Sequence, residues 1–275
     1  MTHLSEAPIG LFDSGLGGLT VAREIMRNLP DEKIVYFGDT ARVPYGNKSK
    51  GTVVRYSEQI LRFLLTQNIK AVVIACNTAS AMALEALRDK TDLPVLGVVS
   101  PGAVMAVKAT RNKRVGVMAT KSTIASESYV KEIHRLDPEV TVVGEPCPLL
   151  VPLVEEGWTN TKITDEILQH YLDHLMAQQV DTIIMGCTHY PLLRNAIARL
   201  VGDEITLVNP AYETALALKK VLDENGLLNT TPANKADPYP YRFFVSDEAE
   251  RFRDFAGMIL PVDVRSAEMI PIEKY

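Results

Sequence analysis

The chain has 275 residues, of which 47% are hydrophobic, and a formal net charge of −5. This length fits one large α/β domain or two smaller domains with a real hydrophobic core. The acidic balance and the lack of a long run of Lys or Arg argue against a surface that binds nucleic acid or an anionic membrane, because both kinds of binding depend on concentrated positive charge. We therefore expect neither nucleic acid nor a membrane as a partner.

The sequence predicts a reduced, cytoplasmic protein. The stretch after Met1 is short and polar, and no apolar run reaches the roughly 18–20 residues that a membrane-spanning helix needs. Three cysteines are an odd number, in a chain too long to need disulfide bonds for stability. No C-x-x-C pair occurs, so we expect free thiols and no metal site.

Short apolar runs alternate along the chain with longer segments of helical periodicity. The predicted strands are residues 9–12, 33–37, 71–75 and 95–99, and the clearest helical segments between them are 19–29 and 52–67. This alternation predicts an α/β fold with mainly parallel central sheets flanked by helices. In such sheets, ligands bind beyond the carboxyl ends of the strands.

The same order of elements recurs after about 110 residues. IGLF at residues 9–12 is echoed by VGVM at 115–118, KAVVIAC at 70–76 by DTIIMGC at 181–187, and VLGVVSP at 95–101, more loosely, by TLVNP at 206–210. A duplicated α/β half explains the echo, and the general likeness of buried strands is the alternative. We expect two similar, pseudo-twofold-related domains with a cleft between them. Residues 1–99 and 210–275 would form the first domain and residues 100–209 the second.

The end of the chain adds a smaller set of elements. Residues 229–240 are polar and rich in proline and predict a surface loop. A strand is predicted at residues 241–245, followed by a helix opened by Ser246 or Asp247 and a short tail.

The first predicted strand leads into FDSGLGG at residues 12–18. Its glycines would let the backbone turn tightly and approach a ligand at the start of the next helix. The segment lacks the spacing of a dinucleotide-binding or P-loop motif, so by itself it predicts a tight turn without a function as readily as a binding loop. Asp13 could act as a base, bind a substrate ammonium group or cap the helix.

Two further loops follow predicted strands. GDTARVPYG at residues 38–46 has the length and mixed chemistry of a binding loop, with Tyr45 and the Gly46 N–H as candidate contacts, although an ordinary turn is possible. In the second half, the strand at residues 141–144 leads to Cys147, for which we favour a structural role. His170 and His174 share a helix face, and we favour an exposed face over a metal site.

Cysteines stand at matching positions in the two halves. Cys76 and Cys187 each follow a predicted buried strand, and the residues after them are Asn77-Thr78 and Thr188-His189. One such cysteine would usually be a small buried hydrophobe. Two at matching positions, each beside a helix N-terminus that can bind a carboxylate, favour a functional pair. His189 could lower the pKa of the Cys187 thiol or donate a proton.

A pair of opposed cysteines suits the inversion of a carbon centre. Inverting an α-carbon requires one proton to leave one face and another to arrive at the opposite face. A thiolate and a thiol on opposite sides can perform these two transfers. Because an α-proton beside a carboxylate is weakly acidic, donors such as Asn77, Thr78 and Thr188 would have to stabilise the charge that develops.

Four motifs together resemble the glutamate racemases, within the aspartate/glutamate racemase superfamily. They are FDSGLGGLTV from Phe12, YFGDTARVPYG from Tyr36, ACNTAS from Ala75 and GCTHYPLL from Gly186. They occur in the family's order and span nearly the whole chain.

The resemblance implies an enzyme that interconverts L-glutamate and D-glutamate with no cofactor and no metal, as a cytoplasmic homodimer that supplies D-glutamate for peptidoglycan. By motif, Cys76 would act on D-glutamate and Cys187 on L-glutamate, with Asp13 and His189 as auxiliary acid/base residues. Glu155 matches a further acidic residue, although Glu156 beside it makes that match ambiguous. The implied substrate-binding residues are Asp13, Ser14, Pro44, Tyr45, Gly46, Asn77, Thr78, Thr188 and His189.

Three other readings remain at this point. A racemase for aspartate differs by one methylene of substrate, which a pocket distinguishes by only about 1–3 kcal/mol. A decarboxylase would need only one of the two cysteines. A non-catalytic binding module between two α/β domains would leave the matched cysteines unexplained.

Overall fold

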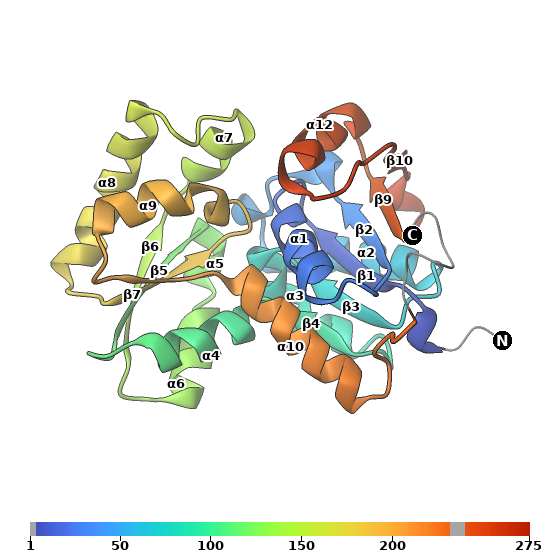
Figure 1. Ribbon diagram of the computed structural model, residues 1–275, viewed down its shortest axis with the longest axis horizontal. Helices are drawn as coiled ribbons and strands as arrows, with labels where there is room; N and C mark the ends of the chain where they lie inside the picture. The colour runs from blue at the N-terminus through green and yellow to red at the C-terminus, as the bar shows by residue number, and fades with distance from the viewer. Residues whose placement is uncertain (1–3, 232–239) are drawn as a thin grey trace.

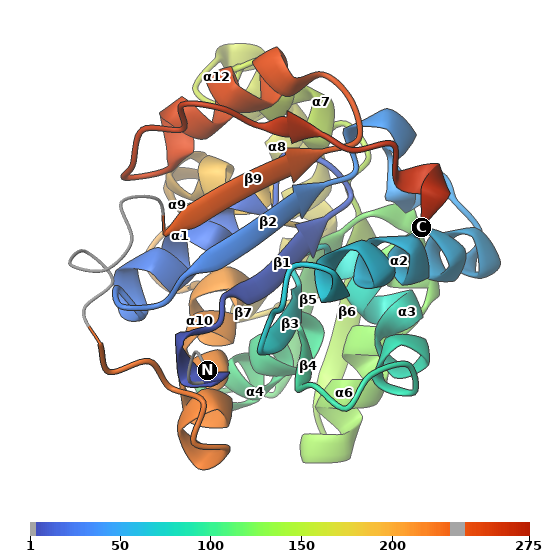
Figure 2. The ribbon, with the colours of Figure 1, turned by 90° about the vertical axis from the view of Figure 1, so that its right-hand side faces the viewer.

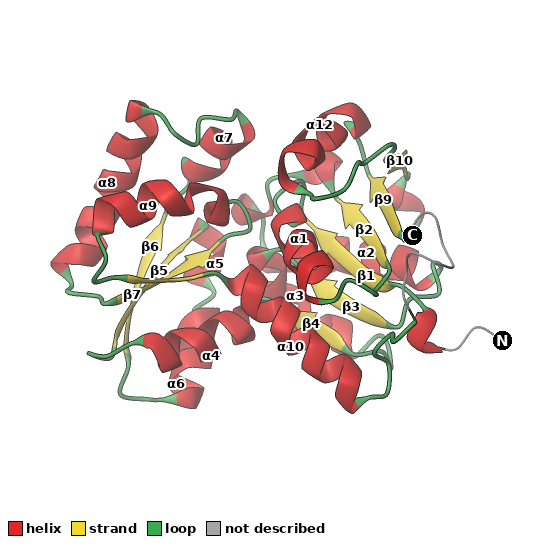
Figure 3. Ribbon diagram, in the orientation of Figure 1, coloured by secondary structure: helices red, strands yellow, loops and turns green. Residues whose placement is uncertain are grey.

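Two parallel β-sheets, each flanked by helices, form the molecule (Figure 1). The computed structural model describes residues 4–231 and 240–275. One sheet has six strands in the order β10-β9-β2-β1-β3-β4, and the other has four in the order β6-β5-β7-β8. Figure 3 shows helices on both sides of each sheet. The predicted α/β fold with parallel sheets is confirmed.

The six-stranded sheet is built from both ends of the chain. Its strands are β1 (Ile9–Asp13), β2 (Ile34–Gly38), β3 (Ala71–Ile74), β4 (Val95–Gly97), β9 (Tyr241–Val245) and β10 (Glu268–Met269). Its helices are α1 (Leu19–Asn28), α2 (Lys50–Leu65), α3 (Asn77–Arg88) and α12 (Ala249–Ile259). All its strand pairs are parallel, and Figure 2 shows β9, β2 and β1 side by side.

The four-stranded sheet comes from the middle of the chain. Its strands are β5 (Arg114–Ala119), β6 (Thr141–Pro146), β7 (Thr182–Gly186) and β8 (Thr206–Val208). Its helices are α5 (Lys121–Ala125), α6 (Ser128–Leu136), α7 (Leu150–Glu155), α8 (Lys162–Ala177) and α9 (Arg194–Val201). Short 3₁₀ helices occupy Leu4–Glu6, Thr40–Arg42, Tyr45–Asn47, Tyr190–Leu193 and Ile272–Lys274.

The strand order of the first sheet recurs in the second. β2-β1-β3-β4 and β6-β5-β7-β8 are the same arrangement when each set is numbered from its first strand. The chain passes between the sheets through α4 (Val99–Ala109) and α10 (Pro210–Glu224), which pack against each other. We propose residues 1–99 with 210–275, and residues 100–209, as two domains.

The buried strands explain why the chain folds in this way. β1, β2, β3 and β7 are buried along their whole length, as strands must be when helices cover both faces of a parallel sheet. One cluster of buried side chains runs from Leu11 and Tyr36 to Met118 and Leu175. The two sheets therefore share part of their hydrophobic core.

The C-terminal region differs from its prediction. α12 begins at Ala249 with Glu248 as its N-cap residue, later than the predicted Ser246 or Asp247. Ser246 Oγ instead donates to Asp39 Oδ1 at 2.9 Å, and the Asp247 carbonyl accepts from Thr40 Oγ1. Both residues are thus bound to the segment after β2. The predicted tail adds the short strand β10 to the sheet edge.

Two further sequence expectations concern a surface loop and membrane-spanning helices. Most of the predicted surface loop, residues 232–239, lies outside the described residues. In the part of the chain that is described, no helix is both long and apolar enough to cross a membrane.

Candidate active site

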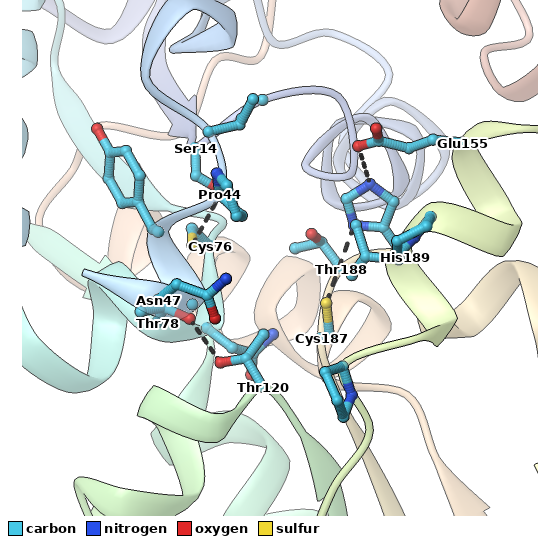
Figure 4. Close-up of a pocket in the computed structure, with 18 of the residues that line it drawn as sticks. Ser14, Pro44, Asn47, Cys76, Thr78, Thr120, Glu155, Cys187, Thr188 and His189 are labelled. Atoms are coloured by element: carbon cyan, nitrogen blue, oxygen red, sulfur yellow. Dashed lines mark hydrogen bonds and ion pairs between the residues drawn. The ribbon is translucent and has the colours of Figure 1, made fainter.

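A cavity of about 350 Å³ lies between the two sheets. Of the residues singled out from the sequence, its wall contains Ser14, Pro44, Tyr45, Gly46, Cys76, Asn77, Thr78, Glu155, Cys187, Thr188 and His189. These residues follow the carboxyl ends of strands in both sheets or lie on α7. Figure 4 shows Cys76 and Cys187 on opposite sides of the cavity.

Cys76 lies at the start of a helix. β3 ends at Ile74 and α3 begins at Asn77, so Cys76 is the N-cap residue, and its Sγ accepts from the Ala79 N–H at 3.4 Å. The thiol also lies 3.5 Å from Ser14 Oγ. Burial, and then the negative charge of Asp13, raise the pKa of Cys76 to about 12. In this arrangement the Cys76 side chain is a protonated thiol at neutral pH.

Asp13 lies beneath the loop that follows β1 and does not line the cavity. Its side chain is fully buried, and Oδ2 accepts from the Gly15 N–H at 3.0 Å. Oδ1 has no hydrogen-bond partner among the described residues. Burial raises the pKa of Asp13, while the charge of His189 and backbone N–H groups oppose that rise. The Asp13 carboxyl therefore lies behind the cavity wall, held by the backbone of the loop after β1.

Cys187, His189 and Glu155 form a series of polar contacts, which we call the contact chain. Cys187 follows β7, and its Sγ lies 3.9 Å from His189 Nδ1. His189 Nε2 lies 3.0 Å from Glu155 Oε1. The other carboxylate oxygen of Glu155 accepts from Arg251 Nη2 at 3.2 Å. Figure 4 shows the first two of these contacts.

The electrostatics of this chain favour a charged imidazole. Burial alone would lower the pKa of His189, but the contacts with Cys187 and Glu155 outweigh it and raise the pKa to about 10. Burial would raise the pKa of Glu155, but His189 and Arg251 lower it below its usual value. His189 is therefore an imidazolium at neutral pH, and its positive charge can stabilise negative charge on the Cys187 sulfur.

The structure separates the two adjacent glutamates of the second half. Glu155 ends α7 and bonds to His189. Glu156 lines the cavity but is exposed and makes no hydrogen bond to His189. Of the two carboxylates, only Glu155 is part of the contact chain.

The loop after β2 is fixed by a buried carboxylate. Asp39 is fully buried and accepts from Arg42 Nε at 2.8 Å, from Ser246 Oγ at 2.9 Å and from the Tyr45 hydroxyl. Because Tyr45 and Gly46 line the cavity, this network sets the position of one wall. This network could not be predicted from local sequence patterns, because Ser246 is 207 residues from Asp39.

Residues from the two halves also meet at Thr78. Thr78 Oγ1 lies 2.9 Å from Thr120 Oγ1 and 3.2 Å from Thr123 Oγ1, and Ser122 Oγ donates to the Gly46 carbonyl at 2.6 Å. Thr120 lines the cavity and was missed in the sequence. The internal repeat could have indicated it, because Thr120 follows β5 as Ser14 follows β1.

The remaining candidates lie at the edge of the site or outside it. Cys147 is buried in the cavity wall, with its Sγ 3.3 Å from the Glu145 carbonyl. His174 Nδ1 lies 2.5 Å from Glu145 Oε2, while His170 contacts the ring of Tyr171. No group of three His, Cys, Asp or Glu side chains suited to a metal ion occurs within residues 4–231 and 240–275.

Comparison with known proteins identifies similar chains over most of this length. Residues 16–218 match the family model of the Asp/Glu/Hydantoin racemases. A glutamate racemase of Geobacter metallireducens is 51% identical over 239 residues, or 87% of each chain, and one of Neisseria meningitidis is 47% identical over 268 residues, or 97% of each chain. The crystal structure of glutamate racemase from Francisella tularensis in complex with D-glutamate has a TM-score of 0.91 at 37% identity, and covers 98% of this chain and 100% of its own.

Proposed function

The chain belongs to the Asp/Glu/Hydantoin racemase family, and we propose on this premise that it interconverts L-glutamate and D-glutamate by proton transfer between Cys187 and Cys76, without a cofactor. The observation that carries the two-cysteine mechanism is that both thiols follow corresponding strands, β7 and β3, and line one cavity. We propose that the protein acts in the cytoplasm as a homodimer. The D-glutamate that it forms would be used in peptidoglycan synthesis.

Each turnover moves one proton off the α-carbon and one onto it. A Cys187 thiolate takes the α-proton of L-glutamate, and the electron pair of the broken C–H bond is delocalised into the α-carboxylate. The Cys76 thiol then gives its proton to the opposite face, which forms D-glutamate and leaves Cys76 as the thiolate. The reverse reaction starts from that form. The imidazolium of His189 beside Cys187 and the raised pKa of Cys76 both favour the form that accepts L-glutamate.

The main energetic difficulty is the negative charge that develops on the substrate carboxylate. Asn77 and Thr78 are the first residues of α3, where helix N–H groups are free to bind an anion. Thr188 lines the opposite wall. Donors already in place in a cavity shielded from water stabilise such charge strongly, because they need no reorganisation during the reaction.

The first test is solvent exchange at the α-carbon. Purified, reduced protein is incubated in heavy water with L-glutamate or L-aspartate and no added cofactor. We expect L-glutamate alone to lose optical activity while deuterium enters the α-position. Exchange of L-aspartate at a comparable rate would change the substrate assignment, and folded protein that exchanges neither would favour a binding module.

Single substitutions test the two thiols. Cys76→Ala and Cys187→Ala should each reduce racemisation by about 10²–10⁴-fold, the usual contribution of a general acid or base. Cys147→Ala is the matched control, since that thiol lies in the same cavity wall but has no role in the proposed transfer. Near-normal turnover in either of the first two variants would disprove the two-thiol mechanism.

A further inference from the structure

We propose that Arg251 is a positioning residue for the contact chain of Cys187, His189 and Glu155, an inference that rests on the proposed function. Arg251 lies on α12, beside the six-stranded sheet, whereas Glu155 ends α7, beside the four-stranded sheet. Figure 1 shows α7 and α12 facing each other at the top of the molecule. Arg251 thus contacts Glu155 from the opposite half of the protein.

The guanidinium is anchored at both ends. Nη1 lies 3.2 Å from Glu248 Oε2 on its own side, and Nη2 lies 3.2 Å from Glu155 Oε2 across the gap. The planar group and its fixed N–H directions suit a carboxylate that must be held in one orientation. Arg251 does not line the cavity, so it acts on the reaction only through Glu155.

Glu155 needs such a partner to keep its orientation. α7 is a helix of six residues and Glu155 is its last, while the carboxylate is partly exposed to water. Oε1 bonds to His189 and Oε2 to Arg251, so the second contact fixes the first. Without Arg251, the Glu155 side chain would regain rotamer freedom and could turn toward solvent.

The ion pair also depends on the relative position of the two halves. Glu155 and Arg251 belong to segments that pack on different sheets, so any separation of α7 from α12 breaks the contact. The series of contacts from Arg251 through Glu155 and His189 to Cys187 is therefore intact only while α7 and α12 keep this relative position. In this way Arg251 links the relative position of the two cavity walls to the orientation and charge of His189.

The titration of His189 tests this inference without any substrate. The titratable groups around His189 are Cys187, Glu155 and, at the end of β1, Asp13. In Arg251→Met, a freed Glu155 would no longer raise the pKa of His189, and burial would be opposed by the Cys187 contact alone, so this pKa should fall by roughly one unit. Arg251 acting only as a distant positive charge predicts the opposite, since its removal would raise that pKa, and this result would overturn the proposal.

The measurement is NMR of protein labelled in its histidine rings, with the His189 signal assigned from its loss in His189→Asn. Arg253→Met is the matched control, because Arg253 is exposed on the same helix and makes no hydrogen bond or ion pair with the described residues. It should leave the His189 titration unchanged. An equal change in both variants would show a general effect of α12 and would also overturn the proposal.

A double-substitution cycle tests the same inference in turnover. Arg251→Met should lower kcat by about 5- to 50-fold with little change in KM, because misplaced acid/base groups slow the chemical step. Added to Glu155→Gln, it should cost less than about twofold, since two residues that act as one unit are not additive. Arg251→Lys should recover part of kcat.

The outcomes separate this inference from the proposed function. Wild-type protein that racemises glutamate, combined with fully additive losses in the double variant, would reject the role of Arg251 alone. Wild-type protein without racemase activity would reject the proposed function, while the histidine titration would still report whether Arg251 positions the chain. Enantiomers have equal free energies in water, so kcat/KM must fall equally in both directions, which checks the kinetic data internally.

Discussion

The segment after β1 packs tightly against the segment after β7, which carries Thr188 and His189. Thr20 Oγ1, at the start of α1, donates to the Thr188 carbonyl at 2.8 Å. Beside it, a Cβ on Gly17 would lie 2.3 Å from Thr188 Oγ1 and 2.5 Å from His189 Nδ1. Glycine at this position therefore lets the β1 loop support the segment that carries His189.

Gly17→Ala should displace that segment. The added methyl group must push away the Thr188 side chain or the His189 ring, and a shift of about 1 Å in an acid/base group can cost up to about 10²-fold in rate. We expect kcat to fall by at least about tenfold and the melting temperature to decrease. Gly257→Ala on α12 is the control, since its Cβ would meet nothing within 4 Å; it should leave kcat close to wild type and should not lower the melting temperature, because alanine favours a helix more than glycine does. Wild-type kinetics in Gly17→Ala would contradict the contact.

The residues of the site differ in how far the sequence could reveal them. Cys76 and Cys187 were predicted because each follows a buried strand within a repeated pattern, and strand ends are where ligands bind in this fold. Arg251 and Asp39 were not, because their roles depend on partners 96 and 207 residues away. Local pattern predicts which residues can face a cavity, whereas contacts between distant segments require the folded chain.

At the scale of elements, the strands were easier to predict than the segments that cap them. The last predicted strand was at residues 241–245, and β9 has those bounds, with the apolar Phe243, Phe244 and Val245 buried. The N-cap residue of α12 is Glu248, one or two residues later than predicted, because Ser246 and Asp247 bond to the loop after β2. β10 has two residues, too few for any periodicity.

The two ends of the strands have different tasks. The carboxyl ends form the cavity, whereas the residue before β3, Lys70, is a buried ammonium at the amino end. Its Nζ donates to the Leu227 carbonyl at 2.9 Å and pairs with Glu32. Lys70 thus connects β3 to the segments before β2 and after α10.

Lys70→Met should therefore affect stability and not chemistry. Removing one partner of a buried ion pair leaves the other charge unpaired, which costs about 3–5 kcal/mol in the free energy of unfolding. We expect that loss in urea titration, with kcat and KM of the folded protein close to wild type. Lys219→Met, at an exposed position on α10, should change stability by less than about 0.5 kcal/mol. A loss of kcat at full stability would place Lys70 in the site instead.

At the scale of the whole molecule, the two sheets have both separate and shared cores. The face of the first sheet that carries Phe12 and Ile74 packs in a cluster of its own, as does the face of the second that carries Val117. The third and largest cluster joins Leu11 to Leu175 through residues such as Ala215 on α10. Separating the proposed domains would therefore expose apolar surface on both.

This shared core predicts that the chain unfolds in one cooperative transition, although it contains two sheets. The measurement is urea unfolding followed by the fluorescence of Trp158, the one tryptophan, which lies between α7 and α8 on the four-stranded side. Hydrogen exchange of peptides from β1 and β3 reports the six-stranded side under the same conditions. Because neither half can lose its structure without exposing the shared cluster to water, which costs about 25 cal/mol per Å² of apolar surface, both probes should give the same midpoint and the same free energy. Two separate midpoints would show that residues 100–209 fold independently, and the cavity walls would then be joined by contacts such as Arg251–Glu155 and Thr20–Thr188 more than by the core.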